Sequence, residues 1–193
     1  MEPEYQRIAI IGASGLLGKP IVNQLSKAGF ALTLLSRDSS KLKETFSELQ
    51  GVTFVEADVD DTEDLKKAFN GTLLLEMLTI GIDAIISVVG SLALATQIGY
   101  IDAAVEAGVK RFIPSEFGCD TQAPYLFHPK LFANNSQEEM IFAQKRGVTA
   151  YLKELSDLNK ITYTLISTGT LPSDGLIVRS LFHVRSSVSC CWD

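Results

Sequence analysis

Residues 8–18 of this chain read Ile8-Ala9-Ile10-Ile11-Gly12-Ala13-Ser14-Gly15-Leu16-Leu17-Gly18, and they indicate the fold class more clearly than any other segment. Its first four residues are apolar without interruption, which is typical of a strand buried on both faces of a parallel sheet. Three glycines spaced G-x-x-G-x-x-G come next, and residues 15–28 then carry apolar side chains at helical spacing. A glycine triplet at the junction of a buried strand and a helix predicts the phosphate-binding loop of a Rossmann-type fold.

Each glycine of this loop has a predicted task. Gly12 lets the chain turn tightly off the strand, Gly15 leaves room for a pyrophosphate to approach the backbone, and Gly18 lets the helix pack closely on the sheet. The first helical turn then presents its N–H groups and the positive end of the helix dipole to the phosphates. The predicted phosphate ligands are the hydroxyl of Ser14 and the backbone around Gly15, Leu16 and Leu17. A glycine triplet alone often marks only a turn, but its place between strand and helix favours a dinucleotide site.

Beyond the loop, apolar strand-like runs alternate with amphipathic stretches along the chain. The alternation predicts a Rossmann-type α/β fold, a doubly wound parallel sheet with helices on both faces. Further strands are expected at 31–36, 52–57, 83–89, 109–114 and 161–167, and further helices at 39–49, 61–69, 94–107 and 138–158. A leucine-rich insertion at 72–81 breaks the rhythm; it is either an unusually apolar connection or an extension of the preceding helix that packs.

The amino-acid composition limits the classes of function that are expected of this chain. The chain has 193 residues, of which 46% are apolar and 21% charged, and a formal net charge of −6; these values are typical of one soluble globular domain. An acidic surface repels phosphate backbones, so no direct nucleic-acid binding is expected. The amino terminus lacks the shape of a secretory signal, and the apolar run at 72–90 is broken by Glu76 and Asp83, so no membrane span is expected. Three cysteines favour a reducing cytoplasm over a disulfide framework, and no metal site is expected.

The end of the second predicted strand selects the cofactor, and it reads Ser36-Arg37-Asp38-Ser39-Ser40-Lys41. An acid at this point would bind the ribose 2′-hydroxyl of NAD, whereas an arginine accommodates the 2′-phosphate of NADP. Arg37 comes first and Lys41 lies one turn into the next helix, so both can converge on a phosphate. Asp38 sits near the position of the NAD acid, or it is the cap of the next helix with Arg37 a solvated residue. The pattern favours NADPH, with NAD the alternative.

Several motifs recur together in one group of proteins. They are the glycine loop, Ser36-Arg37-Asp38, Glu56-Ala57-Asp58, Ile85 to Gly90, Gln97, the run Ala103 to Gly118 containing Arg111-Phe112-Ile113-Pro114-Ser115-Glu116-Phe117-Gly118, and Tyr163 to Gly169. With them the chain resembles the NmrA-like and isoflavone-reductase-like proteins, an atypical branch of the short-chain dehydrogenases. The resemblance is to a truncated fungal member and spans residues 6 to about 170, apart from 72–81 and parts of 121–141. Residues 1–170 would then be the NAD(P)-binding domain.

The resemblance also implies roles for residues at the ends of the later strands. Asp58 and Val59 would meet the adenine. Ser87, Val88 and Gly90 would run beneath the ribose and nicotinamide, and Gln97 would lie near the nicotinamide. Ser115, Glu116 and Phe117 would form the lip of the substrate cleft, at the carboxyl edge of the sheet where open α/β sheets bind ligands. Residues 171–193 would be a remnant, or an irregular tail, of a substrate-binding lobe that is largely missing.

For catalysis, the Tyr-x-x-x-Lys pair of ordinary short-chain dehydrogenases is absent at Tyr100, Tyr125 and Tyr151. The reductase branch uses a lysine at the start of the helix after the fifth strand, and the segment from Phe142 resembles that region, which implies the role for Lys145. Such a lysine would polarise or protonate the substrate, and desolvation would lower its pKa toward a useful range. Alternatively, Lys145 is a solvent-facing lysine beside Arg146. Lys130 is a weaker rival, and His128 is expected on the surface.

Three functions are compatible with this sequence. The first is an NADPH-dependent oxidoreductase of the isoflavone-reductase-like type, acting on a small aromatic or unsaturated carbonyl-type substrate; the substrate class follows from the resemblance alone. The second is a non-catalytic NADP-binding redox sensor of the NmrA type that passes redox state to a protein partner. The third is an inactive truncated product, because a half-open cleft excludes water poorly and fixes a substrate loosely.

Overall fold

The computed structural model describes residues 5–70, 81–118, 120–121 and 136–168. Several features singled out in the sequence lie outside these ranges. They are the insertion at 72–81 except Gly81, the tail 171–193, His128, Lys130 and the three cysteines, Cys119, Cys190 and Cys191. The glycine loop, Arg37, the ends of the strands and Lys145 all lie inside them.

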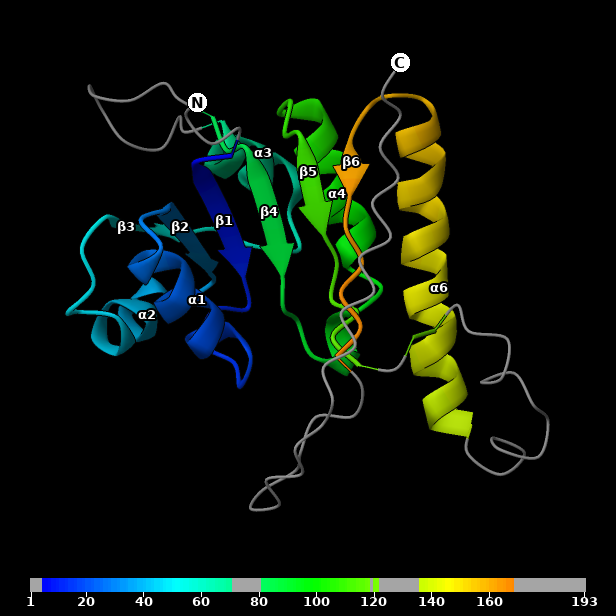
Figure 1. Cartoon of the computed structure of the whole chain (residues 1–193), viewed down its shortest axis with the longest axis horizontal. Helices are drawn as coiled ribbons and strands as arrows, with labels where there is room; N and C mark the ends of the chain where they lie inside the picture. Colours follow the sequence, from blue (N-terminus) through cyan, green and yellow to red (C-terminus); the bar gives the residue numbers. More distant parts are fainter. Residues whose placement is uncertain (1–4, 71–80, 119, 122–135, 169–193) are drawn as a thin grey trace.

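Six parallel strands form one sheet in the order β3-β2-β1-β4-β5-β6. The strands are β1 (Arg7–Ile11), β2 (Ala31–Ser36), β3 (Val52–Glu56), β4 (Ala84–Ser87), β5 (Arg111–Ile113) and β6 (Thr162–Tyr163). The order reverses between β1 and β4, so these two strands flank the topological switch point, outside which α/β proteins bind ligands. The predicted doubly wound parallel fold is therefore confirmed, and Figure 1 shows the arrowheads of β1, β4 and β5 pointing to the same edge of the sheet, called the carboxyl edge below.

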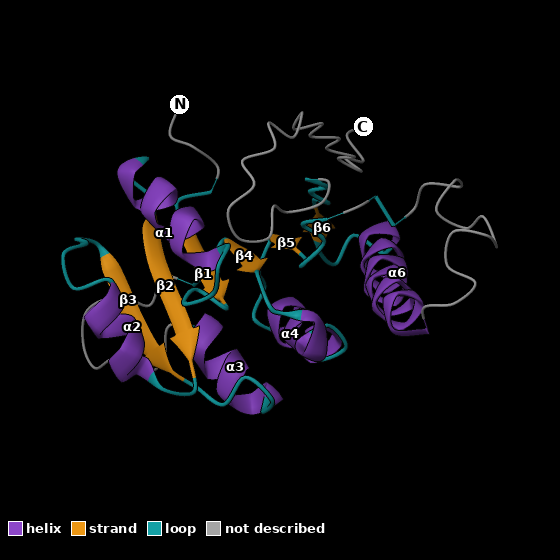
Figure 2. Cartoon of the chain, turned by 90° about the horizontal axis from the view of Figure 1, so that it is seen from below, coloured by secondary structure: helices purple, strands orange, loops and turns teal. Residues whose placement is uncertain are grey.

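Helices cover both faces of this sheet. They are α1 (Gly18–Lys27), α2 (Ser39–Thr45), α3 (Thr62–Phe69), α4 (Gln97–Glu106) and α6 (Ser136–Asp157), with a short 3-10 turn η1 (Ser91–Ala93). One buried cluster joins Ile8, Ile10 and Leu34 of the sheet to Val22 of α1 and to α2. A second cluster joins the opposite faces of the same strands to α3, α4 and α6. Figure 2 shows α1 on one side of the strands and α3 and α4 on the other.

Element types match the sequence predictions, but several boundaries do not. The helix expected from Gly15 begins at Gly18, because the N–H of Gly15 bonds to the carbonyl of Gly12 and closes a turn first. The helix expected over 39–49 ends at Thr45, and the one expected over 94–107 begins at Gln97 after the separate turn η1. The later strands are also shorter than predicted, β6 being a pair of residues at the sheet margin.

The amino edge of the sheet is held by one buried carboxylate. Asp83, just before β4, has a side chain only 6% exposed. It accepts hydrogen bonds from the backbone N–H groups of Gln6 and Arg7 at 3.1 and 3.0 Å and from the Arg7 guanidinium at 2.7 Å. The hydrogen bond from Arg7 is the main reason that the pKa of Asp83 falls from 3.8 to about 2. Asp83 thus ties the start of β1 to the start of β4.

We expect Asp83→Asn to destabilise the fold in a pH-dependent way. Because the pKa of Asp83 is lower in the folded state, its contribution is fully present above about pH 4 and is lost as pH falls toward 2. A depression from 3.8 to about 2 corresponds to about 2 kcal/mol. Urea unfolding of both proteins between pH 2 and 7 checks this, with the difference in unfolding free energy shrinking in acid. A difference that stays constant down to pH 2 would contradict it.

Candidate functional site at the carboxyl edge

The glycine loop has no room for side chains at its first and third glycines. Gly12 adopts φ +90°, and a Cβ at this position would lie 2.6 Å from the carbonyl oxygen of Val88. A Cβ at Gly18 would run into the backbone carbonyls of Gly12 and Ala13. The loop therefore lies directly on the chain that leaves β4, and the start of α1 packs against the loop itself.

The amino end of α1 has no side-chain cap, unlike those of α2 and α3. In α2 and α3 the side chains of Asp38 and Asp61 accept hydrogen bonds from the first free N–H groups. At α1 no side chain in the described part of the chain makes such a cap, and the residue in the capping position is Leu17. Ser14 and Leu16 are exposed beside it. In the first turn of α1 the N–H of Lys19 already donates to the carbonyl of Gly15 at 3.2 Å, and Pro20 has no N–H. This end of α1 therefore offers a phosphate the N–H of Gly18 and the positive end of the helix dipole.

At the end of β2, Arg37 and Asp38 have separate positions. The side chain of Arg37 is 73% exposed, and its Nη1 lies 3.9 Å from Asp60 Oδ2, an exposed pair that holds it only weakly. Asp38 is the cap of α2: it accepts from the Ser40 N–H at 3.0 Å, and hydrogen bonding to Ser40 lowers the pKa of Asp38. Lys41 is exposed in the first turn of α2. Of the two interpretations of Asp38, the structure supports the helix cap.

The residues at the ends of β3 and β4 are predicted to contact the adenine and the ribose. Asp58 is exposed and its carboxylate accepts the N–H of Asp60 at 3.1 Å, while Val59 packs partly against the core. Ser87, the last residue of β4, is fully buried. Its hydroxyl is the one buried side-chain polar atom, within the described ranges, that finds no hydrogen-bond partner. Such an unsatisfied group beside a ligand site is a candidate to bond the ligand.

The segment that follows β4, residues 88–90, lies beside the switch point between β1 and β4. The N–H of Val88 donates to the carbonyl of Ile11 at 2.9 Å, which keeps β1 and β4 in register up to the glycine loop. Gly90 is exposed and immediately precedes η1. Val88 and Gly90 therefore lie where the sequence places the ribose and nicotinamide, and their contact with a cofactor stays a prediction.

Gln97 has a structural task that the sequence did not reveal. It is 1% exposed, its Nε2 donates to the carbonyl of Leu94, and its Oε1 accepts the N–H of Ser115 at 2.8 Å. The hydroxyl of Ser115 in turn donates to the carbonyl of Val89 at 2.8 Å. Gln97 therefore fixes the loop after β5 to α4 and to the end of β4. Its nearness to the nicotinamide stays a prediction.

Lys145 reaches the same loop from α6. It is half-buried, and its ammonium donates to the backbone carbonyl of Glu116 at 2.5 Å. A Cβ added to Gly118 would lie 3.5 Å from this nitrogen, so the loop passes close to it. Lys145 lies near the middle of α6 and not at the start of a helix, where the resemblance had put it. Three contacts, from Gly12 to Val88, from Ser115 to Val89 and from Lys145 to Glu116, thus connect the glycine loop to Lys145.

The carboxylate of Glu116 is buried beneath this contact. Glu116 is 3% exposed, and its two oxygens accept hydrogen bonds from the hydroxyls of Thr149 at 3.3 Å and Thr121 at 3.2 Å. Burial raises the pKa of Glu116, while the positive charge of Lys145 and the two hydroxyls oppose that shift. The sequence had suggested Glu116 only as the lip of a cleft and had missed both threonines, although Thr149 lies one helical turn after Lys145.

A tyrosine on α6 also fixes the helix in place. The hydroxyl of Tyr151 donates to Asp102 of α4 at 2.5 Å, and this hydrogen bond raises the pKa of Tyr151 to about 12. Tyr151 therefore stays protonated at ordinary pH and serves as a contact between the two helices. Lys145 is carried on a helix that is attached both to α4 and to the loop after β5.

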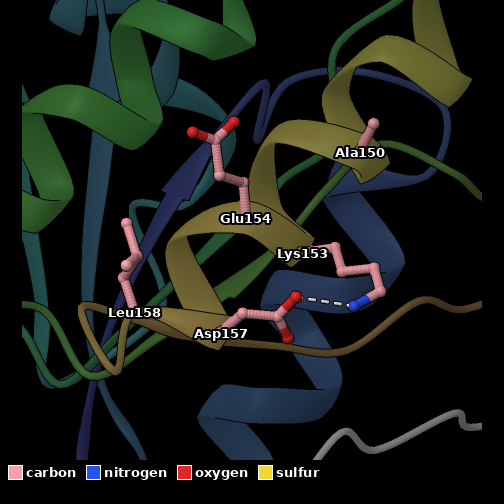
Figure 3. A pocket seen from close by; sticks show the side chains of 5 residues that line it. All are labelled: Ala150, Lys153, Glu154, Asp157 and Leu158. Atoms are coloured by element: carbon pink, nitrogen blue, oxygen red, sulfur yellow. Dashed lines mark hydrogen bonds and ion pairs between the residues drawn. The ribbon is translucent and has the colours of Figure 1, made fainter.

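A shallow hollow on α6 lies apart from this edge. It has a volume of about 440 Å³ and is lined by Ala150, Lys153, Glu154, Asp157 and Leu158. The Nζ of Lys153 lies 2.7 Å from Oδ2 of Asp157, and Figure 3 shows this ion pair as a dashed line. The lining is mixed in charge, and it lies toward the end of α6 that precedes β6.

Two other kinds of site are absent from the residues that the structure describes. None of the described helices combines the length and the apolar character that a membrane span needs. No group of three His, Cys, Asp or Glu side chains among them is arranged to hold a metal ion.

Comparisons with known proteins support the resemblance seen in the sequence. A sequence model of the NmrA-like family matches residues 4–178. An isoflavone reductase homolog of Solanum tuberosum is 39% identical over 142 residues, which are 69% of this chain and 42% of the relative. A phenylcoumaran benzylic ether reductase of Betula pendula is 36% identical over 170 residues, 84% of this chain and 48% of the relative. The chain thus spans less than half the length of each of these two proteins.

A solved structure shares the fold as well. The binary complex of leucoanthocyanidin reductase with NADPH, from Vitis vinifera, has a TM-score of 0.60 and 25% sequence identity. The match covers 84% of this chain and 47% of the reductase. The Rossmann-type half is therefore the part that the chain and this protein have in common.

Proposed function

Because this chain belongs to the NmrA-like family and its relatives include reductases, we propose that it is an NADPH-dependent oxidoreductase of the isoflavone-reductase-like type. One observation carries the proposal. Three features lie at the carboxyl edge of the sheet. They are the start of α1, which has no side-chain cap and follows the tight glycine loop, the exposed Arg37 after β2, and Lys145, which contacts the loop after β5. These are the groups needed for a pyrophosphate, a 2′-phosphate and a reacting carbonyl, respectively.

The cofactor follows from the chemistry of the donors. The glycine loop and the start of α1, which has no side-chain cap, suit a pyrophosphate, and the unsatisfied hydroxyl of Ser87 offers a hydrogen bond beneath the rest of the dinucleotide. Arg37 is exposed and weakly paired, whereas Asp38 is engaged as a helix cap, and this favours NADPH over NADH. A related reductase binds NADPH, which supports the same choice here. When bound, NADPH supplies the hydride.

Lys145 is the proposed proton donor or polarising group. Its ammonium is half-buried and anchored to the carbonyl of Glu116, so it is held at the carboxyl edge. An ammonium at that place can stabilise negative charge on a carbonyl oxygen as hydride arrives, and can deliver a proton to it. The proposed substrate is a small aromatic or unsaturated carbonyl-type compound. The relatives include an isoflavone reductase homolog and a phenylcoumaran benzylic ether reductase, and these names support the aromatic character of the substrate.

The cofactor choice is tested by Arg37→Ala. We expect the Kd for NADPH to rise by about 10- to 100-fold, because one or two charge-assisted hydrogen bonds to the 2′-phosphate are lost, while the Kd for NADH changes little. Calorimetric titration with each cofactor measures both values. Lys43→Ala, which removes an exposed cation of α2, is the matched control and should leave both values near wild type.

Two outcomes separate the proposal from its rivals. An equal loss of NADPH and NADH affinity in Arg37→Ala would contradict the assignment of the 2′-phosphate to Arg37. Tight NADPH binding with no consumption against a panel of aryl-substituted unsaturated carbonyl compounds would favour a redox sensor that acts on a protein partner over a reductase.

A further inference from the structure

The loop after β5 is anchored on both sides at Ser115 and Glu116. On the side of the switch point, Ser115 bonds to Gln97 of α4 and to the carbonyl of Val89 after β4, each at 2.8 Å. On the other side, Glu116 receives Lys145 of α6 on its backbone carbonyl. These two adjacent residues therefore connect the strand that ends at Ser87 to the helix that carries Lys145.

The side chain of Glu116 strengthens the second of these connections. Its carboxylate is buried, and one oxygen accepts the hydroxyl of Thr149, which also belongs to α6. Lys145 and Thr149 are four residues apart and so lie on the same face of α6. The backbone and the side chain of Glu116 thus both contact that face, one above the other. The second oxygen accepts a hydrogen bond from the hydroxyl of Thr121, which holds the carboxylate from the side of the loop.

A buried carboxylate at this position is unusual enough to require a reason. Removing an ionised carboxyl from water is unfavourable unless hydrogen bonds and an opposite charge compensate. Here the compensation comes from two hydroxyls and from the charge of Lys145. Glutamine has the same size but a single acceptor oxygen and no charge. Only a carboxylate therefore accepts from both hydroxyls and also interacts favourably with the charge of Lys145.

We propose that Glu116 is a positioning residue for Lys145: its buried carboxylate docks the loop after β5 on α6 and holds the lysine ammonium at the carboxyl edge. The proposal rests on the function assigned to Lys145 above and adds to it the residue that sets its position. Glu116 itself has no assigned contact with cofactor or substrate. It acts through the lysine and through Ser115, its neighbour.

The position of Lys145 can be measured without any substrate. The purified full chain is treated with limiting acetic anhydride at fixed pH, and the initial acetylation rate of each lysine is followed by mass spectrometry. In Glu116→Gln, which keeps the side-chain volume, we expect Lys145 to be acetylated about fivefold faster or more, the change expected when one net hydrogen bond no longer restrains a side chain. Lys153, an exposed lysine of the same helix, should react at its wild-type rate.

Three further variants complete the experiment. Thr149→Val, which removes only the hydroxyl on the α6 side, should raise the acetylation of Lys145 by a smaller factor and decides the question if Glu116→Gln does not fold. Glu154→Gln, an exposed glutamate of α6, is the matched control. With a turned-over substrate, Glu116→Gln should lower kcat without changing the KM for NADPH, and should lower nothing further in Lys145→Met.

The proposal is overturned if folded Glu116→Gln and Thr149→Val both leave the acetylation of Lys145 at the wild-type rate. It is also overturned if Lys145 and Lys153 speed up equally, because that would indicate general loosening of α6. The acetylation rates do not depend on turnover. A chain that reduces no substrate but shows the selective change at Lys145 would contradict the proposed function and leave the positioning role standing.

Discussion

The Gly12→Ala variant is expected to lose most of its NADPH affinity and much of its stability. Its backbone at φ +90° is strained for any residue with a Cβ, and that Cβ would lie 2.6 Å from the carbonyl of Val88. We expect a decrease in unfolding free energy of about 3 kcal/mol, about 1 from the left-handed backbone and about 2 from displacing the chain after β4. We expect the Kd for NADPH to rise by about 100-fold, because the N–H groups that face the phosphates move with the loop.

A second glycine offers a closely matched control for this experiment. Gly29, just after α1, adopts φ +86°, but nothing lies within 4 Å of a Cβ built on it. Gly29→Ala should therefore cost only the backbone strain, about 1 kcal/mol, and should bind NADPH as the wild type does. Urea unfolding and calorimetric titration of both variants give the comparison. If Gly12→Ala behaved like Gly29→Ala in both measurements, the close contact between the glycine loop and β4 would not matter for binding.

Lys145→Met is expected to abolish most of the turnover while sparing the cofactor site. The substitution keeps an unbranched apolar side chain and removes the ammonium that donates to the Glu116 carbonyl. Loss of a general acid typically lowers kcat by about 100- to 10,000-fold. The Kd for NADPH should stay near wild type, because Lys145 has no proposed contact with the phosphates. Stopped-flow or steady-state oxidation of NADPH, read by absorbance, gives kcat.

The control for this variant is a substitution of another lysine on the same helix. Lys153→Met removes an exposed ammonium that pairs with Asp157, and it should leave kcat unchanged. If Lys145→Met retained a wild-type kcat with a substrate that the wild type reduces, Lys145 would not be the catalytic group, and its contact with Glu116 would be structural only.

The local pattern of the sequence was sufficient to predict the sheet and the glycine loop. Four apolar residues followed by Gly12 can be recognised as a buried strand and a turn because both features are encoded by neighbouring residues. The start of α1 was predicted three residues early, since the turn that Gly15 closes with Gly12 competes with the first helical turn. Whether Asp38 would cap a helix or face a ribose also required the structure, because its residue type suits both tasks.

The contacts around Glu116 could not be predicted from the sequence for a different reason. Thr149 lies 33 residues along the chain from Glu116, and Gln97 lies 18 residues from Ser115. No local periodicity encodes which polar side chains will meet when β5, α4 and α6 assemble. The pair formed by Asp83 and Arg7, 76 residues apart, is another example. Long-range polar contacts of this kind follow from the topology, and the topology must be known first.

Titration of the wild-type chain with each cofactor is the decisive measurement for the proposed NADP site. Calorimetric titration of the purified 193-residue chain with NADPH and, separately, with NADH asks whether the carboxyl edge is a working NADP site. We expect saturable binding of NADPH at least about tenfold tighter than that of NADH, the difference that a single ion pair to the 2′-phosphate supplies. A folded chain that binds neither cofactor, or that prefers NADH, would contradict the assignment of an NADP site to this edge.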